Sequence, residues 1–280
     1  MDKKFLLAIS TYREERNIIE LIKKIRLETS EITILIINDK SNDNTKNLID
    51  NLNDQKIIYL ERPKKLGLGT AHKLSIFFAI KNNYEFLITM DADFSHDPVY
   101  LKKLISLAGE NNFVIGSRFC KGGKSDYKGF RQIISICGNL LSKKLLKINI
   151  NEITTFYRVY STKLLKKFPF DELNAEGYSL GVRLVWLMKK LDADLIETPI
   201  HFKDRNYGKS KIPKFQIFYS LFDLILMKFK DLFLKQKFYE QNPTYNFDIK
   251  CSKCNKNFLT LIKKNNYLCL ICKNYINEKH

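Results

Sequence analysis

The stretch Phe86-Leu-Ile-Thr-Met-Asp-Ala-Asp-Phe-Ser-His-Asp-Pro98 decides how the rest of the chain is interpreted. Its first five residues form a short, largely apolar run that predicts a buried strand. The run stops abruptly at two acids, Asp91 and Asp93. Pro98 then suits the first turn of a helix, with Asp97 as its N-cap. Because α/β sheets bind ligands at the carboxyl ends of parallel strands, the two acids mark a candidate site.

Two carboxylates at one strand end have more than one use. When both are ionised they repel each other, so such a pair commonly holds a divalent cation or shares a proton. Oxygen ligands in this position favour Mg²⁺ or Mn²⁺, bridging to a substrate diphosphate. The alternative is a solvated acidic turn, and an isolated Asp-x-Asp does not distinguish the two. The surrounding sequence has to decide.

Composition limits the classes of protein that the chain can be. Its 280 residues suit one large domain with a small appendage, and 45% hydrophobic residues are enough for a buried core. The formal net charge of +18 indicates a polyanionic partner, either anionic lipid headgroups or nucleic acid. The sequence contains no stretch of about eighteen apolar residues, so no transmembrane helix is predicted. The first apolar run is too short for a signal peptide. The expected location is therefore the cytoplasm.

Strand-like and helix-like segments alternate along the first part of the chain. This order predicts right-handed βαβ units and an α/β fold in which helices flank a mostly parallel sheet. The loops that follow the first, second and fourth strands each carry acids and should meet at one edge of the sheet. Strands are expected at 5–9, 32–37, 56–60 and 86–90, and helices at 18–27, from about 45 to 52, and at 67–81.

Several motifs follow one another in a fixed order along residues 4–212. They are Ser10-Thr11-Tyr12-Arg13-Glu14, Ile36 to Ser41, Arg62 to Ala71, Met90 to His96, Gly116-Ser117-Arg118, Arg131 to Asn139, and Phe202 to Lys211. In this order they resemble the motifs of the inverting family 2 glycosyltransferases with the GT-A fold, close to the dolichol-phosphate mannose synthases. So many ordered matches make coincidence implausible. The resemblance implies a Rossmann-like GT-A domain over residues 1–212.

The resemblance also implies roles for individual residues. Asp93 and Ser95, together with Asp91, would hold Mg²⁺ or Mn²⁺, and Asp91, Ala92 and Asp93 would contact the donor diphosphate. The base and ribose of the nucleotide would be bound by Ser10, Tyr12, Glu14, Ile37 and Asp39.

Three basic residues complete the implied site. Arg118 would face the phosphate of a lipid acceptor, while Arg205 and Lys211 would neutralise phosphate charge when the site is closed. An arginine in a surface ion pair is the alternative for any one of these. The sequence around Arg205 and Lys211, Asp204 to Lys211, is typical of a loop that closes on a donor.

The chain departs from the family pattern at Ser10 and Arg13 of the first motif and at three positions that bear on the acceptor. Glu152 stands where the family has Asp, Phe156 replaces a glycine, and Arg183 replaces a glutamate. Family members with neutral hydroxyl acceptors need a carboxylate base. A phosphate monoester needs little such help, because its second pKa is about 6 and the oxyanion is already present at neutral pH. The loss of a glutamate at Arg183 therefore fits a lipid-phosphate acceptor.

Two further segments have apolar residues at helical spacing. For the first, 131–148, packing in the core and contact with a membrane are both open. The second, 215–233, is apolar nearly all round and has basic ends. It suits a helix lying in a bilayer interface or buried in a dimer contact, which makes a homo-oligomer one alternative. We assign residues 213–240 to this interface helix region.

The last segment, residues 241–280, contains two Cys-x-x-Cys pairs separated by fourteen residues. Four thiolates at such spacing favour a closed tetrahedral Zn²⁺ site over a redox dithiol or disulfides in a reducing compartment. A segment this short cannot bury a core of its own, so the zinc ion would supply its folding energy. The four predicted ligands of this zinc ribbon are Cys251, Cys254, Cys269 and Cys272.

The most specific function that the resemblance implies is transfer of mannose from GDP-mannose to a polyprenyl or dolichyl phosphate. The enzyme would act as a peripheral protein on the inner, cytoplasmic face of the membrane. UDP-glucose or another nucleotide sugar is the alternative donor. A nucleic-acid-binding zinc-ribbon protein is the alternative of another class, which the charge favours. Against it, no nucleic-acid-binding module is recognisable, and strand-end acids repel phosphates unless a metal is bound.

Overall fold

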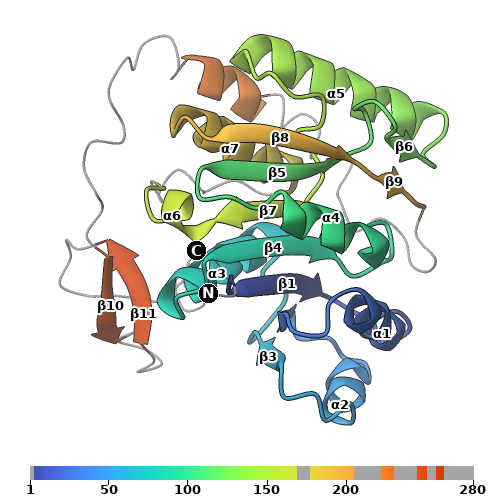
Figure 1. Cartoon of the computed structure of the whole chain (residues 1–280), viewed down its shortest axis with the longest axis vertical. Coiled ribbons are helices and arrows are strands. Elements are labelled where there is room, and N and C mark those ends of the chain that lie inside the picture. The colour runs from blue at the N-terminus through green and yellow to red at the C-terminus, as the bar shows by residue number, and fades with distance from the viewer. Residues whose placement is uncertain (1–2, 169–176, 205–221, 230–244, 251–256, 262–280) are drawn as a thin grey trace.

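A mixed sheet with helices on both faces forms the body of the protein (Figure 1). The same figure shows a separate two-stranded hairpin and a short helix beside the body. The computed structural model describes residues 3–168, 177–204, 222–229, 245–250 and 257–261.

The elements of the body follow one another as alternating strands and helices. The sheet strands are β1 (Phe5–Thr11), β2 (Thr33–Asn38), β3 (Ile57–Glu61), β4 (Phe86–Asp91), β5 (Asn112–Ser117), β7 (Arg158–Ser161) and β8 (Asp194–Pro199). The helices are α1 (Ile18–Glu28), α2 (Thr45–Asp50), α3 (Leu68–Lys81), the 3₁₀ turn η1 (Pro98–Tyr100), α4 (Leu101–Ser106), α5 (Phe130–Leu146), α6 (Thr162–Leu165) and α7 (Gly177–Lys190). Two short pairs of strands complete the description: β6 (Lys124–Ser125) with β9 (His201–Phe202), and β10 (Tyr245–Lys250) with β11 (Asn257–Leu261).

The strand order is β3-β2-β1-β4-β7-β5-β8, and the expected mostly parallel sheet is confirmed. The first four strands of this order pair in parallel, as the βαβ pattern predicts. β7 runs antiparallel to both neighbours, β4 and β5. β5, β7 and β8 are all absent from the sequence prediction. β7 has the weakest local signal, because it has only four residues and its first, Arg158, is a cation inside the core.

Side chains alternate between two buried clusters, one on each face of the sheet. On β4, Leu87 belongs to one cluster, whereas Phe86, Ile88 and Met90 belong to the other. Helices α1, α2 and α4 cover the second face, and α3, α6 and α7 cover the first. Burial on both faces explains why these strands are continuous apolar runs instead of alternating ones.

The expected turn after β4 is present. The Asp97 carboxylate accepts a hydrogen bond of 3.1 Å from the Val99 N–H, and Pro98 opens the 3₁₀ turn. Further along, residues 222–229 are helical within the segment expected to form an interface helix. Among the described ranges, no helix combines the length and the apolar character needed to cross a membrane.

The most unusual group in the core is the guanidinium of Arg158, which is fully buried. It donates to the carbonyl oxygens of Thr155 at 2.6 Å, Ile153 at 2.7 Å and Gly181 at 3.1 Å. Its planar head also lies 5.0 Å from the centre of the Phe156 ring. One side chain thus joins β7, the preceding loop and α7, and it satisfies carbonyls that would otherwise be buried without donors.

We predict that Arg158→Met lowers the free energy of unfolding by roughly 3 kcal/mol or more, because buried carbonyls that lose their donor each cost about 1–3 kcal/mol. Urea unfolding measures the change. Lys163→Met is the matched control, since it removes a cation from an exposed pair with Glu110, with 2.6 Å between Nζ and Oε2. The control should show no measurable change. Equal effects of the two substitutions would contradict a special role for Arg158.

Candidate active site

The carboxyl ends of β1, β2 and β4 meet at one edge of the sheet, as predicted. In the strand register, Ser10 lies between Ile37 of β2 and Asp91 of β4. Three of the predicted site residues are therefore neighbours in space, although 81 residues separate Ser10 from Asp91 in the chain. The Ile37 side chain is completely buried in the core, so only its main chain can face a ligand.

Asp39, just beyond β2, is fixed by contacts from the β3–α3 connection. Its carboxylate forms an ion pair with Arg62 and accepts a 3.0 Å hydrogen bond from the Gly67 N–H. Both side chains of the ion pair are buried. Burial raises the pKa of Asp39 above its ordinary value, although Arg62 and the Gly67 N–H lower it. Arg62 has no role in the sequence prediction, yet it holds this carboxylate in place.

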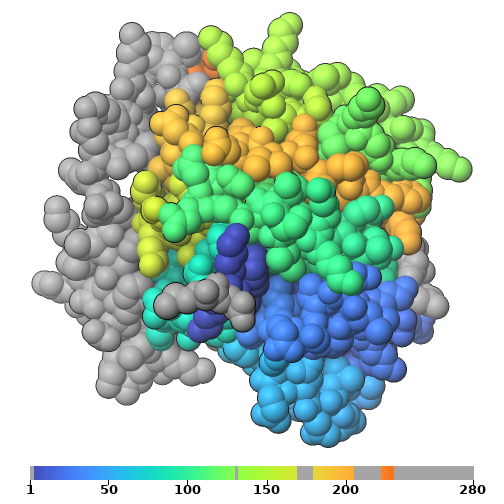
Figure 2. Space-filling model, viewed as in Figure 1, coloured from blue at the N-terminus to red at the C-terminus, as the bar shows by residue number. Residues whose placement is uncertain are grey.

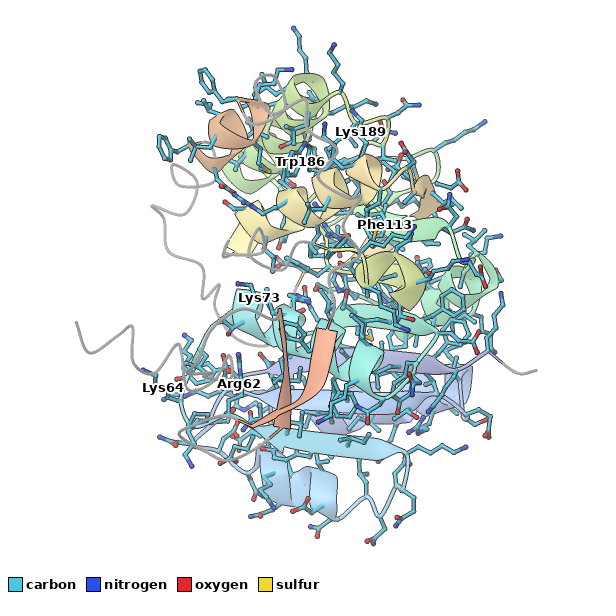
Figure 3. The ribbon with its side chains drawn as sticks, turned by 90° about the vertical axis from the view of Figure 1, so that its left-hand side faces the viewer. Arg62, Lys64, Lys73, Phe113, Trp186 and Lys189 are labelled. Carbon is cyan, nitrogen blue, oxygen red and sulfur yellow. The ribbon has the colours of Figure 1, made fainter. Side chains whose placement is uncertain are left out.

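Cations surround the aromatic ring of Tyr12 on the loop after β1. The Lys65 ammonium lies 4.5 Å from the ring centre, and the Arg13 guanidinium lies 5.3 Å from it. Figure 3 shows Arg62 and Lys64 together on this side of the molecule. Glu14 in the same loop accepts a 2.8 Å hydrogen bond from the Asn17 amide. The pocket predicted for the nucleotide thus lies beside a group of basic side chains.

The acidic loop after β4 is held by its own side chains. One oxygen of the Asp93 carboxylate accepts hydrogen bonds from the Ser95 N–H at 3.1 Å and the Ser95 hydroxyl at 2.6 Å. Asp93 and Ala92 are buried, whereas the Asp91 side chain is 31% exposed. Residues predicted to bind the metal are therefore adjacent, with one carboxylate open to solvent.

The donor set fits a hard divalent cation that shares its ligands with a substrate. Within the part of the chain that the structure describes, no three His, Cys, Asp or Glu side chains gather as a complete metal-ligand set. Mg²⁺ is commonly bound through one or two carboxylates plus the phosphates of its substrate, and two carboxylates with a serine hydroxyl match that pattern. Asp91, Asp93 and Ser95 are the residues that would hold it.

The buried side chain of His96 holds the main chain of this loop, and the sequence prediction gives it no such role. Its Nδ1 accepts a 2.9 Å hydrogen bond from the Asp91 N–H, and its ring is stacked on Tyr157 with 5.0 Å between the ring centroids. Complete burial lowers the pKa of His96 to about 3, so the ring is neutral with its proton on Nε2. A neutral acceptor in this position fixes the direction of the Asp91 main chain.

Arg118, predicted to face the acceptor phosphate, lies at the end of β5 and is buried. Its Nε and Nη2 donate to the two carboxylate oxygens of Glu152 at 2.6 and 3.0 Å. Nη2 also donates to the Thr154 hydroxyl at 2.8 Å. The guanidinium is 4.9 Å from the ring centre of Phe202, which contacts His96 edge-on at 5.4 Å. The Phe202 ring therefore connects the arginine to the acidic loop.

The other two departures from the family pattern have structural partners. Phe156 is stacked on the ring of His72 from α3, with 4.2 Å between the ring centroids and 15° between the planes. Arg183 of α7 forms an ion pair with Asp223 in the helix 222–229. Both pairs link segments that are distant in the sequence, which the sequence prediction does not include.

Some predicted site residues lie outside the described residues. They are Arg205 and Lys211 of the expected closing loop, and Cys251, Cys254, Cys269 and Cys272 of the expected zinc ribbon. Their roles stay predictions. The described hairpin of β10 and β11 flanks residues 251–256, which include the first cysteine pair.

The architecture is that of the GT-A-like glycosyltransferase fold. Solved structures of glucosyl-3-phosphoglycerate synthase from Mycobacterium tuberculosis match it. The complex of that enzyme with Mn²⁺, UDP-glucose and phosphoglyceric acid has a TM-score of 0.60 at 16% identity, covering 81% of this chain and 80% of that chain. The complex with Mn²⁺, UDP and phosphoglyceric acid has a TM-score of 0.59, also at 16% identity, covering 81% and 79%. At this identity the likeness shows the fold alone.

The chain belongs to glycosyl transferase family 2, whose model matches residues 7–169. An undecaprenyl-phosphate mannosyltransferase of Micrococcus luteus is 31% identical over 74% of this chain and 86% of the relative. A polyprenol monophosphomannose synthase of Mycolicibacterium smegmatis is 30% identical over 74% of this chain and 80% of the relative. The expected class of enzyme, a glycosyltransferase, is confirmed.

The buried histidine on α3 predicts how stability depends on pH. Burial lowers the pKa of His72 from 6.5 to about 3. Between these values the unfolded chain binds a proton that the folded protein does not, so stability falls as the pH drops below about 6.5. The slope is about 1.4 kcal/mol per pH unit for this one group. In His72→Gln the fall in unfolding free energy from pH 6 to pH 5 should be smaller by about this amount. An unchanged slope in urea titrations would contradict the assignment.

Proposed function

We propose that the protein transfers mannose from GDP-mannose to a polyprenyl or dolichyl phosphate at the cytoplasmic face of a membrane. One observation carries the proposal. The Asp91–Asp93 loop and the buried cation Arg118 lie at the same edge of the sheet, at the carboxyl ends of β4 and β5. The first suits a nucleoside diphosphate with its metal, and the second suits a phosphate acceptor. The two relatives that are named for mannosyl transfer to polyprenyl phosphates support the choice of sugar and acceptor.

The acceptor supplies its own nucleophile in this proposal. A phosphate monoester has a second pKa of about 6, so one of its oxygens is ionised at neutral pH without a protein base. This oxygen attacks the anomeric carbon from the face opposite the diphosphate. The new C–O bond forms as the bond to the nucleoside diphosphate breaks, and the anomeric configuration inverts. Arg183, paired with Asp223, is a cation in the position of the family's glutamate, which agrees with a reaction that needs no base.

The residues of the site orient the two substrates. A divalent cation held by Asp91, Asp93 and Ser95 would neutralise the charge of the departing diphosphate. Asp39 accepts hydrogen bonds and would bind the base or ribose, with Ser10 and Tyr12 in the same pocket. Arg118 would hold the acceptor phosphate, while Arg205 and Lys211 would neutralise phosphate charge from the closing loop. Zn²⁺ bound by the four cysteines would stabilise only the C-terminal segment.

A transfer assay tests this function. Purified protein with Mg²⁺ or Mn²⁺ is incubated with labelled GDP-mannose, UDP-glucose or UDP-mannose and with polyprenyl phosphate, polyprenol or no acceptor. We expect label in the lipid only with GDP-mannose and polyprenyl phosphate. Asp93→Ala should lower the rate by about 100-fold or more, since the cation loses a ligand. Transfer from UDP-glucose alone would contradict GDP-mannose as the donor. Transfer to free polyprenol would contradict a phosphate as the acceptor.

One end of the molecule carries apolar side chains that suit a bilayer interface. In Figure 1 the helix 222–229 lies beside α5, and in the space-filling view α5 side chains project from the same end (Figure 2). Leu224 and Met227 anchor the helix 222–229 in the core. The exposed large apolar side chains of the two helices form what we call the apolar end face. It consists of Ile133, Ile136, Leu140, Leu141, Phe222, Ile225, Leu226 and Phe229, all of which are exposed.

We predict that this apolar end face holds the protein on anionic membranes. Basic side chains add about 1 kcal/mol each near such a surface, and buried apolar area adds roughly 25 cal/mol per Å². Salt should weaken binding without abolishing it, because only the charged part is screened. In liposome sedimentation, Leu140→Ser with Phe222→Ser should reduce the bound fraction several-fold.

Leu27→Ser is the matched control for the membrane prediction. Leu27 is 81% exposed, but it lies on α1, away from the apolar end face. This variant should bind liposomes like the unchanged protein. Equal losses in both variants would contradict the assigned surface. A protein that ignores acidic liposomes and binds nucleic acid tightly would favour the nucleic-acid alternative.

A further inference from the structure

Glu152 is a fully buried carboxylate whose two oxygens are both used by hydrogen bonds. One oxygen accepts from Nε of Arg118. The other accepts from Nη2 of Arg118, from the N–H and hydroxyl of Thr154, and from the Thr155 N–H at 3.2 Å. Burial raises the pKa of Glu152, but Arg118 and the Thr154 donors outweigh it and hold the pKa below its ordinary value. The carboxylate is therefore ionised at neutral pH.

The loop that carries Glu152 is itself held on several sides. The Glu152 N–H donates to the Glu197 carboxylate at 3.0 Å, and the Ile153 N–H donates to the Asn139 side chain of α5 at 2.7 Å. Arg158 holds the carbonyls of Ile153 and Thr155 from the core side. These contacts restrain the loop and therefore the Glu152 carboxylate. The Arg118 guanidinium that it binds is restrained with it.

Glu152 stands where the family has Asp, and its side chain is one methylene longer. Arg118 is bound side-on, through Nε and Nη2, by both carboxylate oxygens, which is the bidentate geometry that arginine forms best. The rings of Phe119 and Phe202 each lie 4.9 Å from the guanidinium and restrict it further. An arginine that is already immobile loses little side-chain entropy when it binds a phosphate.

We propose that Glu152 is a positioning residue that sets the direction of Arg118 toward the acceptor phosphate. The proposal rests on the proposed function, because it assigns Arg118 to that phosphate. Glu152 also supplies the negative charge without which burial of Arg118 would be costly. The pair stays together when the acceptor binds, and Glu152 acts on the acceptor only through Arg118.

Steady-state kinetics of Glu152→Gln, with donor and acceptor varied separately, tests the proposal. The amide keeps the size of the side chain but cannot accept two charged hydrogen bonds. We expect KM for polyprenyl phosphate to rise about tenfold or more, while KM for GDP-mannose stays within about twofold. Glu152→Asp introduces the residue that the family has. Its KM for polyprenyl phosphate should lie between those of the unchanged protein and of Glu152→Gln. Thermal unfolding shows whether Glu152→Gln folds. If it does not, Glu152→Asp is the test, and it should raise KM for polyprenyl phosphate without raising KM for GDP-mannose.

Two controls separate positioning from general support of the loop. Glu197→Gln weakens one of several contacts that hold the same loop and leaves the Glu152–Arg118 pair in place, so its rise in acceptor KM should be much smaller than that of Glu152→Gln. In an Arg118→Gln background, Glu152→Gln should cause no further rise in acceptor KM, because its effect passes through Arg118. Equal effects of Glu197→Gln and Glu152→Gln, or additive effects in the double variant, would overturn the proposal.

The unchanged protein distinguishes this inference from the proposed function. If it transfers no sugar to polyprenyl phosphate, the proposed function fails and the inference fails with it. If it does transfer sugar and Glu152→Gln leaves acceptor KM unaltered, the inference alone is contradicted.

Discussion

The hydrogen bonds of the buried Arg158 guanidinium are the interactions on which the proposed acceptor side of the site depends. Three main-chain carbonyls, from Ile153, Thr155 and Gly181, receive its hydrogen bonds. These bonds fix the loop between α5 and β7 against α7, and that loop carries Glu152. The Glu152 carboxylate in turn fixes Arg118 at the end of β5. A cation in the core thus determines the position of a second cation in the site, through main chain and one carboxylate.

The proposed donor side of the site has a different construction, based on the ends of parallel strands. Asp39 and Asp91 occupy their places because β2, β1 and β4 pair in parallel register. A buried side chain then holds each of them. The cation Arg62 forms an ion pair with Asp39, and the neutral ring of His96 accepts a hydrogen bond from the Asp91 main chain. The donor side therefore depends on strand register, and the acceptor side on long-range side-chain contacts.

This difference explains what could be predicted from the sequence. Strand ends carry a local signal, an apolar run that stops at acids, and so Asp39, Asp91 and Asp93 were predictable together with the α/β fold. The partners of Arg118 and Arg183 were not, because Glu152 and Asp223 lie 34 and 40 residues away and no local pattern connects them. β5, β7 and β8 are not among the predicted strands, and β7 has the weakest signal of the three, because a four-residue strand that begins with a charged residue has no apolar periodicity.

In the proposed reaction a phosphate acceptor attacks the sugar directly, and Arg183 stands in the position of the family's glutamate. Direct attack is a single displacement and inverts the anomeric carbon once. The configuration of the sugar–phosphate bond in the lipid product, measured by nuclear magnetic resonance of its anomeric centre, tests for direct attack. We expect the configuration opposite to that of the nucleotide sugar. A product with the configuration of the donor would require a second displacement through a protein nucleophile, and it would contradict direct attack by the acceptor phosphate.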